Sequence, residues 1–346
     1  MKVCLLNDSF PPVIDGVANV VMNYGRLLSE EGNEVLVGTP RYPDVSYDGY
    51  PYRVLPYRSF DTTKLVSGYR AGNPLEMKAV EDMAAFAPDV IHTHCPVAST
   101  VVARLLRNEL KKRDEGAEPP LIFTYHTKFD VDIARAVKSE LLQKESAKAL
   151  VDNISACDEV WVVSRGAGEN LKALGFAGGY RVMANGVDFP KGSADKESVE
   201  GLNESYDLPS GVPVFLFVGR MMKYKGLPII IGAMRRLAEA GVDYRMVFVG
   251  GGADLGEMRA LAEAYGLAVE VYAEAKDACD ADAACVAAKE KEILYRGQGT
   301  GSGKLIFAGP EHDRNVLRAW NTRADVFLFP STYDTNGIVV REAAAC

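Results

Sequence analysis

Residues 214–226 read Val-Phe-Leu-Phe-Val-Gly-Arg-Met-Met-Lys-Tyr-Lys-Gly, and this stretch does most to define the fold. Its first five residues are apolar without a break, which is typical of a strand buried on both faces of a parallel sheet. A helix is predicted to follow from Leu227, because Pro228 is tolerated in a first turn. Arg220 and Lys225 then lie in the loop at the carboxyl end of the strand, where open α/β sheets bind ligands. Two cations beside a helix N-terminus suit a diphosphate, although a solvated basic turn explains this segment alone equally well.

The same alternation of short apolar runs and amphipathic stretches extends in both directions along the chain. The other predicted strands are Val3–Asn7, Glu34–Gly38, Arg53–Pro56, Val90–Thr93, Leu121–Tyr125, Val160–Ser164, Arg181–Ala184, Met246–Val249, Leu305–Ala308 and Val326–Phe329. The predicted helices are Val17–Glu31, Leu75–Phe86, Ala98–Lys112, Val131–Ala156, Gly166–Leu174, Leu227–Glu239, Leu255–Tyr265 and Val316–Arg323. Apolar strands separated by helices indicate parallel sheets covered on both faces.

The alternation of strands and helices runs once before residue 188 and starts again at Val214. These two sets of elements predict an α/β chain with two doubly wound, Rossmann-like domains that face a cleft, and 346 residues suit two domains. The first domain is predicted over residues 1–187 and the second over 214–346, with a polar linker rich in Gly, Ser, Pro and charge over 188–213. An insertion is predicted over about 268–303, and its Ala-rich part from Ala273 to Glu292 favours a surface helix. The last helix is unfinished at Cys346, so the second domain is predicted to be incomplete.

The composition excludes several classes of protein. Hydrophobic residues make up 48% and charged residues 25%, a globular balance, and the net charge of -8 argues against nucleic acid as a partner. No window reaches 18 apolar residues, and the N-terminus lacks the features of a signal peptide. The six cysteines are scattered, which favours reduced thiols in a cytoplasmic protein. Small molecules are therefore the expected partners.

Residues 329–342 repeat the arrangement of strand end, polar loop and helix start. The helix is predicted to begin near Gly337, with Asp334 in the loop before it and Glu342 further along. A carboxylate at this edge can accept hydrogen bonds from sugar or ribose hydroxyls. The alternatives are that Glu342 is a surface helix residue and that Asp334 caps the helix, a common role for aspartate.

Polar residues also follow the predicted strands of the first domain. Gly16 lies in the loop after the first strand, where a glycine lets the backbone approach a ligand. His126 comes just past a buried strand, and its position makes it a candidate for the site. His92 and His94 resemble a metal pair, but no third ligand is evident nearby, so a structural role is favoured. We expect no essential metal and no cofactor.

Taken in this order and spacing, these segments resemble the retaining glycosyltransferases of glycosyltransferase family 4, which have the GT-B fold. The resemblance covers nearly the whole chain. It is carried by the Gly16 loop, Pro88-Asp89-Val90-Ile91-His92, Thr124-Tyr125-His126-Thr127, Asn185-Gly186-Val187-Asp188, Gly219-Arg220 with Lys225-Gly226, and the closing acidic motif. Within the family, the chain is most similar to bacterial enzymes that glucosylate diacylglycerol.

The resemblance implies a donor site for a nucleotide sugar, with UDP-glucose as the expected donor. Arg220 and Lys225 would hold the donor diphosphate and stabilise the charge that develops as it leaves. Glu342 matches the second glutamate of the family's E-x7-E motif, which binds the ribose, whereas Asp334 replaces the first glutamate with a shorter side chain. The remaining implied donor-site residues are Gly219, Asn336, Gly337, His126 near the transferred sugar, and Gly16 near the phosphate or the acceptor.

The implied reaction is a front-face displacement in which the acceptor hydroxyl attacks on the side from which the nucleoside diphosphate departs. The acceptor is expected to be a lipid such as diacylglycerol. The predicted helix Val131–Ala156 combines apolar residues at helical spacing with Arg135, Lys138, Lys144 and Lys148, as a helix resting on an anionic membrane would. A core-facing stripe with a solvated polar side is the favoured alternative. The expected location is cytoplasmic, with peripheral contact to the inner face of the membrane.

Two other functions compete with this interpretation. A nucleotide-sugar 2-epimerase uses two such domains and the same donor, but it needs additional acid and base residues in the cleft. An inactive nucleotide-sugar-binding fragment is the other alternative, because the second domain reads as incomplete. We expect the chain to be less stable and less active than a completed one, a difference that melting temperature and turnover would measure.

Overall fold

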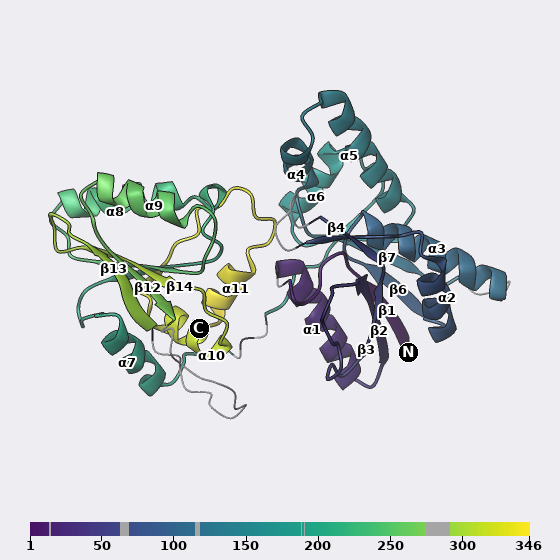
Figure 1. The fold of residues 1–346 in the computed structure, drawn as a ribbon, viewed down its shortest axis with the longest axis horizontal. Helices are drawn as coiled ribbons and strands as arrows, with labels where there is room; N and C mark the ends of the chain where they lie inside the picture. The colour runs from purple at the N-terminus through teal and green to yellow at the C-terminus, as the bar shows by residue number, and fades with distance from the viewer. Residues whose placement is uncertain (14, 63–68, 115–117, 188, 190, 275–290) are drawn as a thin grey trace. The chain divides into compact units, whose positions relative to one another are not determined.

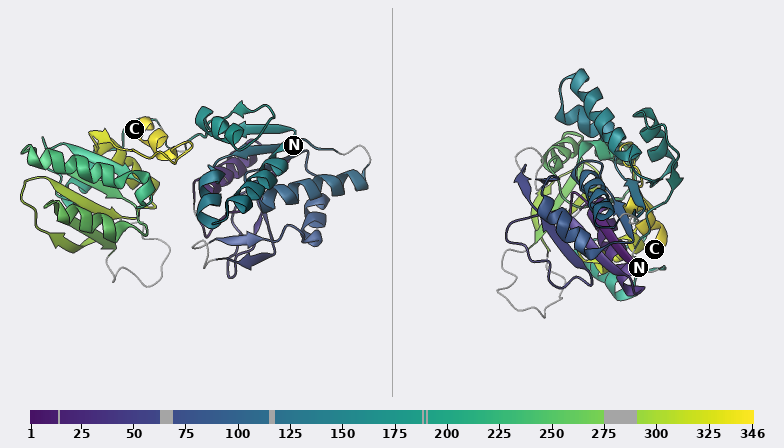
Figure 2. Two further views of the ribbon diagram at one scale, coloured as in Figure 1. Left: turned by 90° about the horizontal axis from the view of Figure 1, so that it is seen from above. Right: turned by 90° about the vertical axis from the view of Figure 1, so that its right-hand side faces the viewer.

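The computed structural model describes residues 1–13, 15–62, 69–114, 118–187, 189, 191–274 and 291–346. The chain divides into two compact units, Met1–Asn185 and Gly186–Cys346. Each unit is built around its own sheet, with helices on both faces (Figures 1 and 2). The predicted α/β class is confirmed, with a Rossmann-like arrangement in each unit.

The first unit contains a seven-stranded sheet in the order β3-β2-β1-β6-β7-β8-β9, in which every neighbouring pair is parallel. The strands are β1 (Lys2–Leu6), β2 (Glu34–Pro40), β3 (Arg53–Tyr57), β6 (Val90–Thr93), β7 (Leu121–Tyr125), β8 (Glu159–Val162) and β9 (Arg181–Val182), with a separate hairpin of β4 (Ser59–Asp61) and β5 (Arg70–Gly72). The helices are α1 (Gly16–Glu30), α2 (Met77–Phe86), α3 (Ala98–Arg113), α4 (Phe129–Ala136), α5 (Glu140–Ser155) and α6 (Arg165–Ala173).

Successive side chains of β1 lie on opposite faces of the sheet, so the core of this unit has a part on each face. Cys4 and Leu6 pack with α2 and α3, whereas Val3 and Leu5 pack with Val21 of α1 on the other face. Figure 1 shows α1 on one side of the sheet and α2 and α3 on the other. Because both faces of the sheet are buried away from water, the strands read as continuous apolar runs.

The second unit contains a six-stranded sheet in the order β13-β12-β14-β11-β10-β15. The strands are β10 (Val214–Val218), β11 (Arg245–Val249), β12 (Ala268–Glu274), β13 (Lys291–Gly297), β14 (Lys304–Gly309) and β15 (Val326–Phe327), and only β13 is antiparallel to its neighbour. The helices are α7 (Lys196–Ser205), the 3-10 turn η1 (Lys223–Lys225), α8 (Leu227–Glu239), α9 (Leu255–Ala264), α10 (Arg314–Arg323) and α11 (Ile338–Ala345). One face of the sheet packs against α7 and α10, and the other packs against α8 and α9.

Three segments differ from the sequence-based expectation. The single helix predicted over 131–156 is wrong, because the extended backbone at Val137 (φ -121°, ψ 120°) separates α4 from α5. The stretch 188–213, expected to link two domains, holds α7, and its buried Leu202 and Tyr206 pack in the core of the second unit. The predicted insertion over 268–303 supplies β12 and β13, and residues 275–290, within the predicted surface helix, lie outside the described residues.

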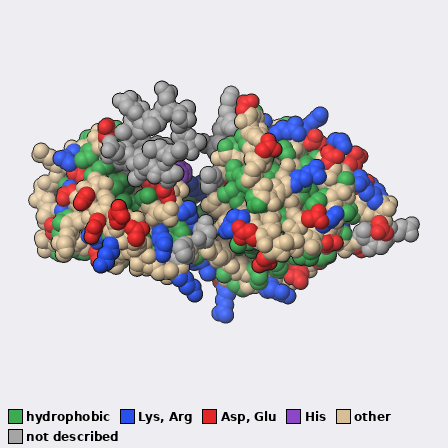
Figure 3. Space-filling view, turned by 90° about the horizontal axis from the view of Figure 1, so that it is seen from below, with side chains coloured by type: hydrophobic (Ala, Val, Ile, Leu, Met, Phe, Trp, Pro, Cys, Tyr) green, Lys and Arg blue, Asp and Glu red, His purple; other side chains and the backbone are tan. Residues whose placement is uncertain are grey.

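Charges of both signs are interspersed on the face of the molecule drawn in Figure 3. Cys4, Cys95, Cys157 and Cys346 are free thiols, and the other two cysteines lie outside the described residues. Among the helices of the described part of the chain, none combines the length and the apolar character that a membrane span requires.

Candidate functional site

Of the two cations predicted after β10, Arg220 precedes the short turn η1 and Lys225 is its last residue. Lys225 Nζ lies 2.5 Å from Asp334 Oδ1, and the lysine side chain is only 12% exposed. The same ammonium lies 5.6 Å from the ring centroids of both Tyr224 and Phe329. Arg220 is exposed, and its Nη2 donates to the Tyr224 hydroxyl at 3.0 Å. A solvated basic turn therefore does not describe Lys225, whose charge is largely buried and paired.

Glycines allow the loops at this edge of the second sheet to pack backbone against backbone. Gly219 and Gly226 have positive φ angles of 151° and 82°. A Cβ on Gly226 would lie 2.6 Å from the carbonyl oxygen of Pro330, and one on Gly250 would lie 2.1 Å from the carbonyl oxygen of Gly219. Only glycine fits such positions. The loops after β10, β11 and β15 therefore form one platform that carries the two cations.

The acidic motif contributes carboxylates in two different settings. Glu342 on α11 is only 6% exposed, and its Oε1 accepts from Arg314 Nη2 at 2.7 Å. The N-cap position of α11 is Gly337, with no side-chain capping bond, while Asp334 pairs with Lys225. The alternatives of a surface residue for Glu342 and a helix cap for Asp334 are therefore wrong.

Asn336 lies just before α11, and its Oδ1 accepts from Arg341 Nε at 3.2 Å. No side chain caps α11 at Gly337, and the Val340 amide in the first turn donates to the Gly337 carbonyl at 2.9 Å. Arg314, at the start of α10, was not singled out from the sequence. Its guanidinium lies 4.1 Å from the Phe189 ring centroid while it pairs with Glu342, and the partners are 28 positions apart along the chain, which leaves no local signal.

In the first unit, three buried histidines lie together at the carboxyl edge of the sheet. His94 Nδ1 lies 3.0 Å from His126 Nε2, and the His92 and His94 ring centroids are 4.2 Å apart. His92 Nε2 lies 2.7 Å from the hydroxyl of Thr124. Sequence reasoning singled out His126 and favoured a structural role for the other two. The structure places His94 in direct contact with His126.

Burial controls the charge of these histidines. Desolvation lowers the pKa of His126 to about 4, against a smaller opposing effect of Asp15, and lowers the pKa of His92 to about 3. The pKa of His94 is well below its usual value for the same reason. All three imidazoles are therefore neutral at pH 7, so in the His94–His126 hydrogen bond one ring donates and the other accepts.

The loop after β1 binds helix N-termini within its own unit. Gly16 is the first residue of α1, and the Asp15 carboxylate accepts from the amides of Val17 and Ala18 at 2.9 and 2.7 Å. Those two amides are thus already satisfied by the chain itself. Asp8, missed in the sequence, accepts from the amides of Ala98 and Ser99 at the start of α3, and burial raises the pKa of its carboxyl.

Within the described residues, no group of three or more His, Cys, Asp or Glu side chains has the geometry to hold a metal ion. Two of the predicted site residues, Gly16 and His126, belong to the first unit. The second unit contains Gly219, Arg220, Lys225, Asp334, Asn336, Gly337 and Glu342. Of these, Lys225 and Asp334 are in direct contact.

Comparison with known proteins gives matches over both units. The family described as Glycosyltransferase Family 4 matches residues 14–190, and the family Glycosyl transferases group 1 matches 199–277. Sulfoquinovosyl transferase SQD2 of Arabidopsis thaliana is 26% identical over 336 residues, which cover 95% of this chain and 55% of that protein. An alpha-monoglucosyldiacylglycerol synthase of Streptococcus pneumoniae is 22% identical over 271 residues, covering 76% of this chain and 58% of its own length. The chain thus spans little more than half the length of these relatives.

The fold is also found among solved structures. HepE from Anabaena in complex with UDP superposes with a TM-score of 0.68 at 15% identity, and the match covers 100% of this chain and 79% of that one. The structure of HepE with UDP-glucose gives a TM-score of 0.64 at 16% identity, over 100% and 78% of the two chains. At these identities the likeness shows a shared fold.

Proposed function

Because the chain belongs to glycosyltransferase family 4, we propose that it transfers a hexose from a nucleotide sugar to an acceptor hydroxyl, with retention at the anomeric carbon. The observation that carries this proposal is the platform after β10 and β15, where Lys225 and Arg220 supply two cations at the ligand-binding edge of an α/β sheet. The crystal structures of HepE with UDP and UDP-glucose, which share the fold, support UDP-glucose as the donor.

In this proposal the platform binds the donor through its diphosphate. Lys225 and Arg220 contact the phosphate oxygens and stabilise the negative charge that grows as the sugar bond breaks. Lys225 holds Asp334 in the free protein, so phosphate binding releases that carboxylate to accept hydrogen bonds from the sugar hydroxyls. Glu342 keeps its Oε1 bond to Arg314 and offers Oε2 to the ribose. Backbone amides at Gly337 complete the donor contacts.

The proposed reaction is a front-face displacement. The acceptor oxygen forms the new bond to the anomeric carbon as the bond from that carbon to the phosphate oxygen breaks. The departing phosphate takes the proton of the acceptor hydroxyl, so no protein carboxylate has to act as nucleophile. The protein contributes positioning and fixed charges, with His126 beside the transferred sugar. A reaction without an essential metal remains a prediction.

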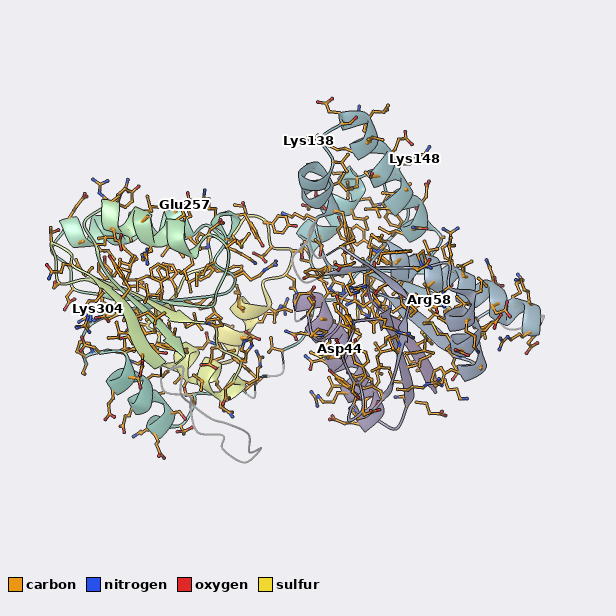
Figure 4. All side chains as sticks on the ribbon, in the orientation of Figure 1. Asp44, Arg58, Lys138, Lys148, Glu257 and Lys304 are labelled. Carbon is orange, nitrogen blue, oxygen red and sulfur yellow. The ribbon has the colours of Figure 1, made fainter. Side chains whose placement is uncertain are left out.

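The proposed acceptor is a membrane lipid such as diacylglycerol, reached from the cytoplasmic surface. The streptococcal relative, named as a synthase of monoglucosyldiacylglycerol, supports this choice. The start of α5 exposes two leucines, Leu141 at 68% and Leu142 at 57%. Lys138 and Lys148, labelled in Figure 4, are exposed nearby. Exposed leucines beside lysines suit peripheral contact with an anionic bilayer.

A thermal-shift experiment with UDP, UDP-glucose, GDP and NAD tests the donor site. A ligand present at one hundred times its Kd stabilises the fold by about 2.7 kcal/mol, which is readily detected. We expect stabilisation by UDP and UDP-glucose that is lost in Arg220→Ala and Glu342→Ala. The control is Arg236→Ala, which removes an exposed charge from the last turn of α8. Stabilisation by NAD alone, or equal UDP shifts in all variants, would contradict the proposal.

A further inference from the structure

We propose that a pocket lined by three arginines in the first unit binds a phosphate group carried by the acceptor, which is then a phosphorylated lipid or ester in place of diacylglycerol itself. The arginine pocket is an open depression of about 360 Å³, and it is lined by Arg41, Pro43, Arg58, Ser59, Phe60, Arg70 and Asn73. That volume can hold a phosphate ester together with the first part of the molecule that carries it. The assignment to an acceptor rests on the proposed transferase function, whereas the phosphate-binding property does not.

Three separate segments bring the arginines together. Arg41 directly follows β2, Arg58 directly follows β3, and Arg70 begins β5 of the hairpin. Ser59 joins them, because its hydroxyl donates to the Arg41 carbonyl at 2.5 Å and accepts from Arg70 Nε at 2.8 Å. The Arg41 amide also donates to the carbonyl of Tyr57 at 2.7 Å. The pocket is therefore held by hydrogen bonds that do not depend on a ligand.

Close packing fixes the hairpin over the strand ends. A Cβ on Gly72 would lie 2.6 Å from the Tyr57 ring and 3.1 Å from Pro40, so only glycine lets β5 approach β2 and β3 so closely. Arg70 is thereby held largely buried, with its side chain 18% exposed. A buried arginine with a fixed guanidinium loses little entropy when it binds a planar or tetrahedral oxyanion.

The protein neutralises the charge of the pocket only in part, because two of the three arginines have a carboxylate nearby and Arg41 has none among the described residues. None of the lining residues is acidic. Arg58 shares Glu76, with Nε 3.4 Å from Oε1, and Arg70 Nη1 lies 3.9 Å from the exposed Asp61. Arg41 forms no ion pair with any described carboxylate, and its guanidinium makes one long hydrogen bond of 3.3 Å to the Pro56 carbonyl. The pocket thus keeps unpaired donor groups that match the oxygens of a phosphate.

The position of the pocket links it to the acceptor. Its arginines follow β2 and β3 at the same edge of the sheet at which His126 follows β7. Neighbouring strands are ~4.8 Å apart, so Arg41 after β2 and His126 after β7, three strands away, are separated by roughly 15 Å along that edge. An acceptor that reaches both would carry its phosphate on the order of 10–15 Å from the hydroxyl that reacts. Short phosphate esters would occupy the pocket without reaching the reacting sugar.

Calorimetric titration with inorganic phosphate tests the pocket directly. We expect saturable binding that weakens at least tenfold in Arg41→Gln, a substitution that removes one charge and a single long hydrogen bond. The matched control is Arg53→Gln, at the exposed start of β3 away from the pocket. Arg220→Gln is the comparison variant that shows how much of the phosphate binds at the proposed donor platform of the second unit. Binding that is absent, or that is lost in Arg220→Gln and retained in Arg41→Gln, overturns the proposal.

Two further probes identify the source of the phosphate. Glycerol 3-phosphate represents a soluble ester, and vesicles of phosphatidylglycerol in phosphatidylcholine, compared with phosphatidylcholine alone, represent a lipid headgroup. Binding that is sensitive to Arg41→Gln with either probe supports the pocket and assigns the source, and insensitivity with both overturns it. A normal UDP shift in Arg41→Gln separates this outcome from the donor site. If the unsubstituted protein shows no thermal shift with UDP but still binds phosphate, the transferase proposal is refuted and the pocket stays in place.

Discussion

The three buried histidines make the first unit sensitive to acid. Because the pKa of His126 falls to about 4 and that of His92 to about 3, both rings stay neutral in the folded unit at pH 5. In the unfolded chain the same rings have a pKa near 6.5 and are protonated at pH 5. The unfolded chain therefore binds more protons, and its free energy falls relative to the folded unit as the pH is lowered.

The size of the effect follows from the pKa difference. Between pH 6.5 and pH 5, each histidine lowers the free energy of unfolding by about 1.36 kcal/mol per pH unit. The free energy of unfolding at pH 5 is therefore lower by about 2 kcal/mol for each histidine. The full stability is present above pH 6.5. For His126 the loss continues until about pH 4, below which the folded ring also takes up its proton. Replacing His126 with glutamine should therefore remove about 2 kcal/mol of the loss measured between pH 7 and pH 5.

The sequence offers a separate fluorescent reporter for each unit. It contains two tryptophans, Trp161 on β8 of the first unit and Trp320 on α10 of the second. Urea unfolding of a Trp320→Phe background, followed by fluorescence at pH 7 and pH 5, reports the first unit. The test variant is His126→Gln in that background. The control is His312→Gln, because His312 is exposed in the second unit.

We expect the control to show the same pH dependence as the background and the test variant to show a smaller one. An equal loss of unfolding free energy in all three proteins would refute the assignment of a neutral, buried His126. The imidazole proton resonances provide a second reading on the folded protein. A His126 resonance that shifts between pH 7 and pH 5.5 would contradict the pKa depression.

Two further predictions concern the second unit. Gly226→Ala should destabilise it by at least about 2 kcal/mol, because φ is 82° and the new Cβ would meet the Pro330 carbonyl. Gly232→Ala should stabilise it by about 0.5–1 kcal/mol, because Gly232 lies on α8 with open space around its Cβ position. Opposite signs in Trp320-monitored unfolding are expected, and two equal shifts would contradict the reasoning. Arg314→Ala should cost about 1–3 kcal/mol because it leaves the buried Glu342 carboxylate without its partner, and the additional replacement Glu342→Gln should restore part of the loss. A double-variant stability equal to that of Arg314→Ala would refute the pairing argument.

The sequence predicted the parallel sheets because their strands are short apolar runs with helices between them. It also placed candidate residues in the loops after β10 and β15, and the structure shows that these two strands are neighbours whose carboxyl ends meet at one edge. Their adjacency brings Lys225 into contact with Asp334 although 109 positions separate them along the chain. In the same way, the adjacency of β6 and β7 brings His94 into contact with His126. The order of the strands was not predicted from the sequence, and neither were these contacts.

The errors arose where local composition and tertiary packing disagree. β13 is an edge strand whose Leu294 is 67% exposed, so the period-2 burial that marks a strand is weak there. The break at Val137 contains neither glycine nor proline, and only Ser139, the N-cap of α5, hints at it. The helix α7 was concealed by polar residues, although Asp195 caps it by accepting from the Ser198 amide at 2.8 Å.

The electrostatic settings of the two sheet edges differ, and each can be related to the proposed transfer reaction. At the second sheet, Lys225 and Arg220 lie where the proposed donor would place its diphosphate, and two cations there would stabilise growing negative charge. At the first sheet, burial keeps His126 uncharged. Sugar transfer develops positive charge at the anomeric carbon, and an imidazolium beside that carbon would oppose it. We infer that the low pKa of His126 serves the proposed chemistry, because a neutral ring can contact the sugar through hydrogen bonds without adding a second positive charge. The acid sensitivity of the first unit is then the thermodynamic cost of keeping that ring neutral.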